Sequence, residues 1–370
     1  MTELGETTLD LDLSALEHNY NFLRSKVRPQ TKFLAVVKAF AYGSDMQAIA
    51  KKLESLGADA LAVAYVREGL SLREAGIQLP ILVLHPLQAN FKDLIQGRLE
   101  PSLYSPMVLE QFLVQAQREG QRDYPVHLKF NTGLNRLGFA PGDITEIAKK
   151  LKGTRAVALQ SVFSHLAASE DPQEREFSLG QIRDFEKMAA SLGRALGHTP
   201  IRHMLNTSGI IHYAQEAQFE MVRSGIGLYG YGNGPEVDVQ LRPVASLRTI
   251  ISQIHEIDAD QTVGYNRAFR SQGKIRTATL PLGHADGIGR QYGNGKAAVS
   301  IKGKAAPIIG NVCMDMIMVD VSGVDCREGD EVLVFGPNSP AEWFANQAGT
   351  ISYEILTAIS QRVKRQIIGN

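Results

Sequence analysis

The chain has 370 residues, and its 39 Lys and Arg balance its 39 Asp and Glu, so the formal net charge is zero. This balance gives no electrostatic basis for binding nucleic acid or an anionic membrane surface. The length exceeds one ordinary core and suits a large barrel with a second domain. The only cysteines, Cys313 and Cys326, cannot build a disulfide framework, and the N-terminus lacks signal-peptide features, so we expect a cytoplasmic location.

The first segment with a clear pattern is Thr7–Leu13 (TTLDLDL), whose alternation predicts a β-strand. Ser14 and Glu17 form a capping box, which predicts that a helix begins at this serine. We expect residues 1–13 to form an N-terminal strand that packs with the C-terminal domain.

Between residues 33 and 230, short β-rich runs alternate with stretches of helical periodicity. This alternation indicates parallel strands joined by crossover helices, and eight repeats favour a closed (β/α)8 TIM-like barrel over residues 14–236. The expected strands are Phe33–Lys38, Ala60–Tyr65, Pro80–His85, Leu99–Tyr104, Val126–Asn131, Leu159–His165, Arg202–Asn206 and Glu220–Ile226. The amphipathic stretches between them include Met46–Leu56, Ser105–Arg118, Asp143–Leu151 and Glu174–Leu192.

Polar residues end these expected strands, where a (β/α)8 barrel carries its functional groups. Lys38 is the most informative, because burial at a strand end lowers a lysine pKa and makes its amine a base and a nucleophile. A lysine that extends to water would also fit this position. The other polar strand ends are Tyr65, His85, Tyr104, Lys129, Asn131, His165, Asn206 and Arg223, of which His85 and Tyr104 are expected to be structural.

Two loops after the strands have chemistry suited to anions. Arg136 lies on a glycine-bearing loop within Lys129–Phe139 (KFNTGLNRLGF), and its planar guanidinium suits a carboxylate or phenolate. Lys129 itself is expected to pair with an acid inside the barrel. Gly225 and Gly227, after the eighth strand, can turn backbone N–H groups toward a phosphate.

After Gly232 the pattern changes to period-two runs separated by turns, which predicts a mainly-β domain over residues 237–370. A helix is expected at Tyr353–Arg365. No Cys-x-x-Cys or His-x-x-x-His spacing occurs, so we expect no metal site. The period-two runs are Leu247–Ile257, Thr277–Leu282, Ala297–Ile301, Ala306–Ile309, Met316–Val321 and Glu331–Phe335.

This second domain has three short motifs: Gly264-Tyr265, Gly283–Gly287 (GHADG) and Gly310–Met316 (GNVCMDM). In order and spacing, these and the barrel motifs closely resemble those of the alanine racemases. The resemblance extends from Leu11–Asn19 (LDLSALEHN) to Ile351–Ile355 (ISYEI). It implies an isomerase that uses pyridoxal 5'-phosphate (PLP), acts on a small amino acid, and shares its active sites between the subunits of a head-to-tail homodimer.

The resemblance also implies individual roles. Lys38 would form the Schiff base with the cofactor aldehyde, and Tyr265 of the partner subunit would be the second base. Arg136 would bind the cofactor phenolic oxygen and the substrate carboxylate, and the partner's Met314 and Asp315 would also reach the substrate. The remaining cofactor-binding residues would be Tyr42, His165, Asn206, Thr207, Arg223, Gly225, Ile226 and Tyr353, with Arg223 at the pyridine nitrogen.

The implied reaction interconverts L-alanine and D-alanine by a two-base mechanism and supplies D-alanine for peptidoglycan. Lys129 resembles a lysine that some family members carbamylate, and the sequence leaves this modification open. Other interpretations are a serine or broad-specificity racemase, a PLP-dependent barrel decarboxylase and a non-catalytic PLP-binding barrel. The last two are disfavoured because the decarboxylase motifs are absent and a carrier needs no second base such as Tyr265.

Several positions depart from the family pattern, and they leave the preference among small substrates open. Asn, Asp, Ser, Tyr and Arg are usual at these positions, where this chain has Phe40, Asn131, Thr207, His284 and Asn311 respectively.

Overall fold

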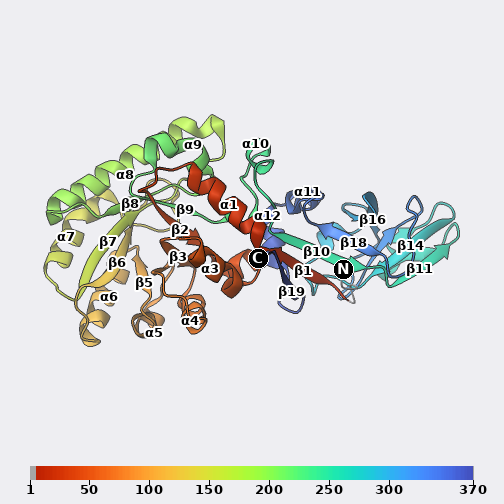
Figure 1. The fold of residues 1–370 in the computed structure, drawn as a ribbon, viewed down its shortest axis with the longest axis horizontal. Coiled ribbons are helices and arrows are strands. Elements are labelled where there is room, and N and C mark those ends of the chain that lie inside the picture. The colour runs from red at the N-terminus through yellow and green to blue at the C-terminus, as the bar shows by residue number, and fades with distance from the viewer. Residues whose placement is uncertain (1–5, 370) are drawn as a thin grey trace.

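The computed structural model describes residues 6–369, so residues 1–5 of the expected strand segment 1–13 lie outside it. The molecule is elongated, with a barrel at one end and a second, mainly-β region at the other (Figure 1). Within the described residues, eight parallel strands close the barrel in chain order, which confirms the predicted fold class. These strands are β2 (Lys32–Val36), β3 (Ala60–Val63), β4 (Ile81–Val83), β5 (Glu100–Leu103), β6 (Tyr124–Lys129), β7 (Val157–Phe163), β8 (Ile201–His203) and β9 (Met221–Ser224).

All eight of these strands end one to three residues earlier than predicted, so polar residues such as Lys38, Tyr65 and His165 lie just beyond them. Helices surround the barrel, and none within the part of the chain that the structure describes is long and apolar enough to cross a membrane. The helices of this half are α1 (Leu13–Ser25), α2 (Lys38–Gly43), α3 (Met46–Ser55), α4 (Val66–Glu74), α5 (Phe91–Gln96), α6 (Pro106–Arg118), α7 (Ile144–Lys152), α8 (Arg175–Leu196) and α9 (Thr207–Ala217).

The start of α1 differs from the prediction. Asp12, and not Ser14, caps this helix, because its carboxylate accepts from the backbone N–H groups of Ser14 (2.8 Å) and Ala15 (3.1 Å). Aspartate is as good an N-cap as serine, and here it is also the last residue of the preceding strand. The strand therefore leads directly into the helix.

The second region is built on a sheet that has nine strands in residues 6–369, in the order β11-β14-β17-β16-β15-β18-β10-β1-β19. All its neighbours are antiparallel except β1 and β19, which are parallel. Its strands are β1 (Thr8–Asp12), β10 (Ala245–Ile250), β11 (Gln253–Ile257), β14 (Ile275–Leu280), β15 (Ala298–Ile301), β16 (Lys304–Ile309), β17 (Ile317–Asp320), β18 (Glu331–Phe335) and β19 (Lys364–Ile368). The smaller elements are β12 (Thr262–Val263), β13 (Phe269–Arg270), α10 (Pro235–Asp238), α11 (Ala341–Asn346) and α12 (Ser352–Ala358).

Two predictions for this region were wrong in extent. The run Leu247–Ile257 forms two strands, because the chain turns after Ile250 and β11 pairs with β14 rather than continuing β10. The expected helix Tyr353–Arg365 ends at Ala358, and its last residues begin β19. The strand β19 pairs in parallel with β1, which comes from the opposite end of the chain, so no local sequence signal identifies β19.

The C-terminal strand also contacts the barrel. From β19, Arg365 donates hydrogen bonds to the carbonyl oxygens of Gly43 (2.8 Å) and Ser44 (3.3 Å), at the end of α2. Its guanidinium also reaches the carbonyl oxygen of Ile359, just after α12 (2.9 Å). A single side chain therefore connects the sheet to the barrel segment that follows Lys38.

The connection between the two regions depends on Asn19, which is fully buried in α1. Its Nδ2 donates to the carbonyl oxygens of Leu228 (3.1 Å) and Arg242 (2.7 Å), and its Oδ1 accepts from the Arg242 N–H (2.8 Å). These three bonds satisfy backbone groups of the segment that leaves the barrel, where burial excludes water as a substitute.

We therefore predict that Asn19→Ala lowers the free energy of unfolding by about 2–4 kcal/mol, since buried backbone groups lose their partners. Urea unfolding followed by circular dichroism measures this change. His18→Ala is the matched control, because the neighbouring side chain bonds the same segment at the Gln240 carbonyl from a more exposed position. Equal losses in the two variants would contradict the assignment.

Candidate active site

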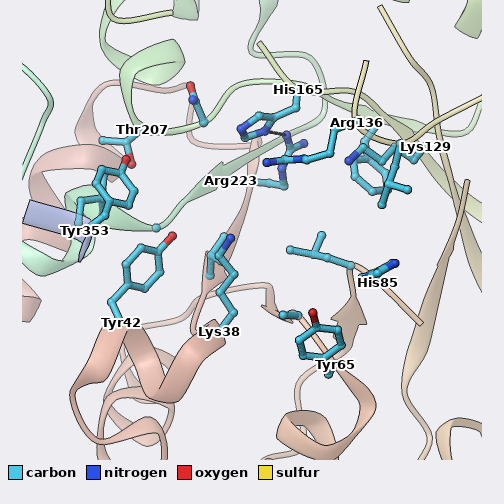
Figure 2. Close-up of a pocket in the computed structure, with 18 residues that line it drawn as sticks. Lys38, Tyr42, Tyr65, His85, Lys129, Arg136, His165, Thr207, Arg223 and Tyr353 are labelled. Atoms are coloured by element: carbon cyan, nitrogen blue, oxygen red, sulfur yellow. Dashed lines mark hydrogen bonds between the residues drawn. The ribbon is translucent and has the colours of Figure 1, made fainter. Parts of the chain in front are cut away.

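A cavity of about 750 Å³ opens at the carboxyl ends of the barrel strands (Figure 2). The structure brings together there a large share of the residues expected from the sequence, although they come from distant parts of the chain. Those that line it are Lys38, Tyr42, Lys129, Arg136, His165, Asn206, Thr207, Arg223, Gly225, Ile226 and Tyr353. Tyr265, Met314 and Asp315 do not line this cavity and lie elsewhere in the same chain.

One wall of the cavity is formed by two residues that the predicted set of binding residues does not include. Tyr65 and His85 line it and lie 5.8 Å apart between ring centroids, and His85 is 5.6 Å from Tyr104. Both lining residues follow strand ends, so their position was a usable signal. His85, which we expected to be structural, therefore faces the cavity as well as packing on Tyr104.

The cavity contains four basic side chains and no acid among its lining residues: Lys38, Lys129, Arg136 and Arg223. Within residues 6–369, none of these four groups has a carboxylate oxygen within 4.0 Å of its nitrogen atoms, so none forms an ion pair. The prediction that Lys129 pairs with a barrel acid is therefore wrong. Unpaired cations are costly to bury, so this arrangement suits an anionic ligand that the protein itself does not supply.

Burial and mutual repulsion weaken the bases in this cavity. Burial is the main factor that lowers the pKa of Lys38, and the charge of Arg136 lowers it further, while Glu68 opposes both. Burial, with Arg136 and Arg223, lowers the pKa of Lys129 to about 8. Both amines are therefore more available in their neutral, nucleophilic form than a surface lysine.

The backbone after Lys38 has an unusual conformation. The residues Ala39, Phe40, Ala41 and Tyr42 have φ of 53 to 55°, so they form a left-handed turn, in which each residue costs about 1–2 kcal/mol. The Glu68 carboxylate holds this turn by accepting from the N–H of Ala39 (2.5 Å). Its second oxygen accepts from Ala64 (2.7 Å) at the end of β3, so the turn is fixed to the neighbouring strand.

Arg223 is anchored by an extensive set of acceptors. Its Nη2 donates to the carbonyl oxygens of Ser164 (2.7 Å) and Met204 (3.0 Å), and lies 3.3 Å from His165 Nδ1. Its Nη1 donates to Nδ1 (2.8 Å) and to the carbonyl oxygen (3.1 Å) of His203. Burial lowers the pKa of Arg223 to about 9, so the guanidinium still keeps its proton at neutral pH.

His165 is neutral in this environment. Burial lowers its pKa well below the usual value, and the charge of Arg223 lowers it further. Because Arg223 can only donate, His165 Nδ1 must accept, and the proton of the imidazole then lies on Nε2. The contact with Arg223 is visible in Figure 2.

The opposite side of the cavity is rich in neutral hydrogen-bond donors. Tyr42 and Tyr353 are 6.0 Å apart between ring centroids. Burial raises the pKa of Tyr42 and raises that of Tyr353 to about 12, so both phenols stay protonated. Gly225 packs so closely that a Cβ there would lie 2.1 Å from Tyr42 Oη. Ile226 begins a helical turn, where N–H groups have no partner within the helix.

Two asparagines organise the loops around the cavity. Asn206 caps α9 by accepting from the N–H of Gly209 (2.9 Å), which places Thr207 in the first turn of this helix. Asn131 accepts from the N–H groups of Gly133 (3.2 Å) and Asn135 (3.0 Å) and so closes the first part of the loop that carries Arg136. Asn131 stands where Asp is usual in the family, and its uncharged side chain still organises this loop.

The three residues outside the barrel cavity lie on the second region. Tyr265 and Met314 are 73% and 59% exposed, and they line a shallow depression of about 490 Å³ with Asp315. Asn311 Nδ2 donates to the carbonyl oxygen of Tyr265 (3.0 Å). Asp315 is held by Arg362 (2.7 Å), so this exposed surface is built from fixed loops.

Comparisons with known proteins agree with this arrangement. The sequence profile described as alanine racemase, N-terminal domain, matches residues 11–233, and the one described as alanine racemase, C-terminal domain, matches residues 244–367. An alanine racemase of Desulfovibrio desulfuricans is 34% identical over 363 residues, covering 96% of each chain.

Solved structures agree with the sequence comparisons. An alanine racemase of Clostridium difficile 630 matches with a TM-score of 0.92 at 32% identity, covering 99% of this chain and 96% of that one. The alanine racemase of Bartonella henselae, described with covalently bound pyridoxal phosphate, matches with a TM-score of 0.87 at 30% identity, covering 98% and 100%. This chain therefore belongs to the alanine racemase family.

Proposed function

We propose that the barrel cavity racemises alanine with PLP and two bases, Lys38 and Tyr265 of the partner subunit, and that the D-alanine supplies peptidoglycan synthesis. The observation that carries this proposal is the cluster of four cations without an acid, next to an amine whose pKa is lowered. A bound PLP would supply a phosphate, a phenolic oxygen and an electron-withdrawing conjugated ring that stabilises a carbanion.

The residues of the cavity fit this cofactor by their chemistry. The protonated phenols of Tyr42 and Tyr353, the Thr207 hydroxyl and the N–H groups of Gly225 and Ile226 would hold the phosphate. Lys38 would bind the aldehyde carbon. Arg136 would hold the phenolic oxygen and the substrate carboxylate. Arg223, which keeps its own proton, would donate to the pyridine nitrogen.

The second base is expected from another copy of this chain. Tyr265 is largely exposed and lines a separate depression of its own chain, together with the exposed Met314 and Met316. Large apolar side chains clustered on a surface are typical of a protein interface. A homodimer that covers this surface would bring Tyr265, Met314 and Asp315 of the partner subunit to the barrel mouth.

Racemisation removes the Cα proton from one face and returns a proton to the other, so one base on each face is the simplest arrangement. Lys38 Nζ serves one face and Tyr265 Oη of the partner subunit serves the other. A phenol has a pKa of about 10 and needs stabilisation to act as a base. His165 Nε2–H, set by Arg223 at Nδ1, is a donor suited to this phenolate oxygen.

We further propose that Lys129 carries a carbamate. The ammonium would first lose one proton, and the neutral amine would then attack CO₂, form an N–C bond and release a second proton. The loss of two protons and the addition of CO₂ turn a cation into an anion beside Arg136. The absence of an acid partner for Lys129 in the described residues, together with its pKa of about 8, supports this modification.

Mixing Lys38→Ala with Tyr265→Phe subunits should restore activity, because each hybrid dimer regains one complete site. With random exchange, half the dimers are hybrids with one working site of two, so about a quarter of wild-type activity is expected. A coupled assay of D-alanine formation measures it. Mixing Lys38→Ala with the double variant is the control, and lack of rescue despite demonstrated subunit exchange would exclude a shared site.

Tyr265→Phe should slow the exchange of Cα hydrogen for solvent deuterium in one enantiomer by about 10²–10⁴-fold, since one general base is lost. Exchange in the other enantiomer should be retained, because Lys38 serves it. Proton NMR follows both reactions. Tyr65→Phe, which removes another phenol at the cavity, is the matched control. Equal slowing of both enantiomers would argue against separate bases.

Equilibration with ¹³C-labelled CO₂ should produce a carbamate carbon signal that disappears in Lys129→Met. At constant dissolved CO₂ the signal should grow from pH 7 to pH 8.5, since the neutral amine reacts and the pKa of Lys129 is about 8. Lys150→Met, which removes a lysine paired with Glu110, should keep the signal. A spectrum of Lys129→Met identical to that of the wild type would contradict the modification.

A further inference from the structure

A row of buried side chains leads from Arg223 away from the cavity through the barrel. Each of the five consecutive strands β5 to β9 contributes one member: Glu100, His127, Ser161, His203 and Arg223. We call the first four the barrel relay. His127, Ser161 and His203 are 6%, 0% and 0% exposed, so no water competes for these contacts.

Every link in this row is a short hydrogen bond. Arg223 Nη1 lies 2.8 Å from His203 Nδ1, and His203 Nε2 lies 2.8 Å from Ser161 Oγ. Ser161 Oγ lies 2.6 Å from His127 Nδ1, and His127 Nε2 lies 2.7 Å from Glu100 Oε2. The Glu100 side chain is 19% exposed, at the start of β5 and so at the end of the barrel opposite the cavity.

The two ends decide the direction of every bond. Arg223 can only donate, so His203 Nδ1 accepts and its proton lies on Nε2. That proton is donated to Ser161 Oγ, whose own hydroxyl proton then goes to His127 Nδ1. The His127 proton therefore lies on Nε2 and is donated to the Glu100 carboxylate, which can only accept when ionised. With neutral imidazoles and an ionised Glu100, no other assignment satisfies all four links.

The relay matters to the cavity through the donors of Arg223. Both terminal amino groups of this guanidinium are engaged with His203 and with neighbouring carbonyl oxygens. Its Nε–H has no hydrogen-bond partner among the described residues. It is also not among the fully buried polar atoms without a partner in these residues, so it remains accessible. Nε–H is thus the donor left for a ligand in the cavity, and the orientation of the guanidinium decides where it points.

We propose that Glu100, His127 and Ser161 are positioning residues for Arg223, because they hold His203 in the tautomer that accepts from Nη1. In the opposite tautomer, His203 Nδ1–H would face an arginine N–H, and two donors would oppose each other. The guanidinium would then turn, and its Nε–H would no longer point toward the ligand position in the cavity. This role builds on the proposed function, in which Arg223 faces the pyridine nitrogen.

The stacking of His203 makes the tautomer the only variable at this link. Its ring lies 4.9 Å from that of Phe163 with an interplanar angle of 12°, and this contact together with full burial fixes the ring plane. Burial and then the charge of Arg223 lower the pKa of His203 well below the usual value, so the ring stays neutral. Because a 180° flip of the ring would break the contacts of both nitrogens, a neutral ring held in this plane can change only the nitrogen that carries its proton.

Nitrogen NMR of PLP-loaded protein with ¹⁵N-labelled histidine rings tests this proposal. In the wild type, His127 and His203 should both show an unprotonated Nδ1 and a protonated Nε2, with signals assigned from His127→Gln and His203→Gln. Ser161→Ala should give His203 a mixture of tautomers and raise the dissociation constant of PLP about tenfold, as expected for the loss of one buried hydrogen bond. Ser161→Thr keeps the hydroxyl and should keep the wild-type signals.

Ser102→Ala is the matched control. Ser102 is fully buried on β5, directly opposite His127 in register, and its hydroxyl has no partner within residues 6–369. Its removal should leave both the tautomers and PLP affinity unchanged. A protonated Nδ1 on His203 in the wild type would overturn the proposal even if Ser161→Ala does not fold. So would a Ser161→Ala protein that matches Ser102→Ala in both measurements. Because the nitrogen signals do not depend on turnover, they test the positioning role even in a protein without racemase activity.

Discussion

The accumulation of four positive side chains at the barrel mouth, without an acid among them, is the constraint on which the site depends. Repulsion and burial lower the pKa of Lys38 and bring that of Lys129 to about 8, and they keep His165 neutral. The same positive field attracts anions such as phosphate and carboxylate. The properties of the nucleophile and the affinity for an anionic ligand therefore have one electrostatic origin.

The left-handed turn after Lys38 shows how the fold supports a strained site. Four residues without glycine hold positive φ, and such strain persists only where the surroundings over-determine the backbone. Glu68 fixes the start of the turn from β3 and α4, and Arg365 fixes its end from β19. Through Arg365, the second region contributes to the geometry of the barrel cavity without lining most of it.

The fold class and most of the cavity could be predicted from the sequence, because alternation and polar strand ends are local signals. Tyr265, Met314 and Asp315 were recognised only through their motifs, and nothing in composition relates them to the barrel. The partner of Lys129 was mispredicted, because sequence does not show which charges share a cavity. The barrel relay combines residues from four strands, and β19 takes a strand partner that begins more than 350 residues earlier, so long-range pairing determines both.

The pairing of β1 with both β10 and β19 affects the order in which the protein can fold during synthesis. The strands of the barrel are complete once Ser224 has been made, so the barrel can close while the rest is still on the ribosome. Within residues 6–369, Thr8–Asp12 is the first strand to be synthesised, yet its parallel partner is the last. Until β19 has been made, this strand has an unpaired edge, which makes it a site for chaperone contact or misassembly with a neighbouring nascent chain.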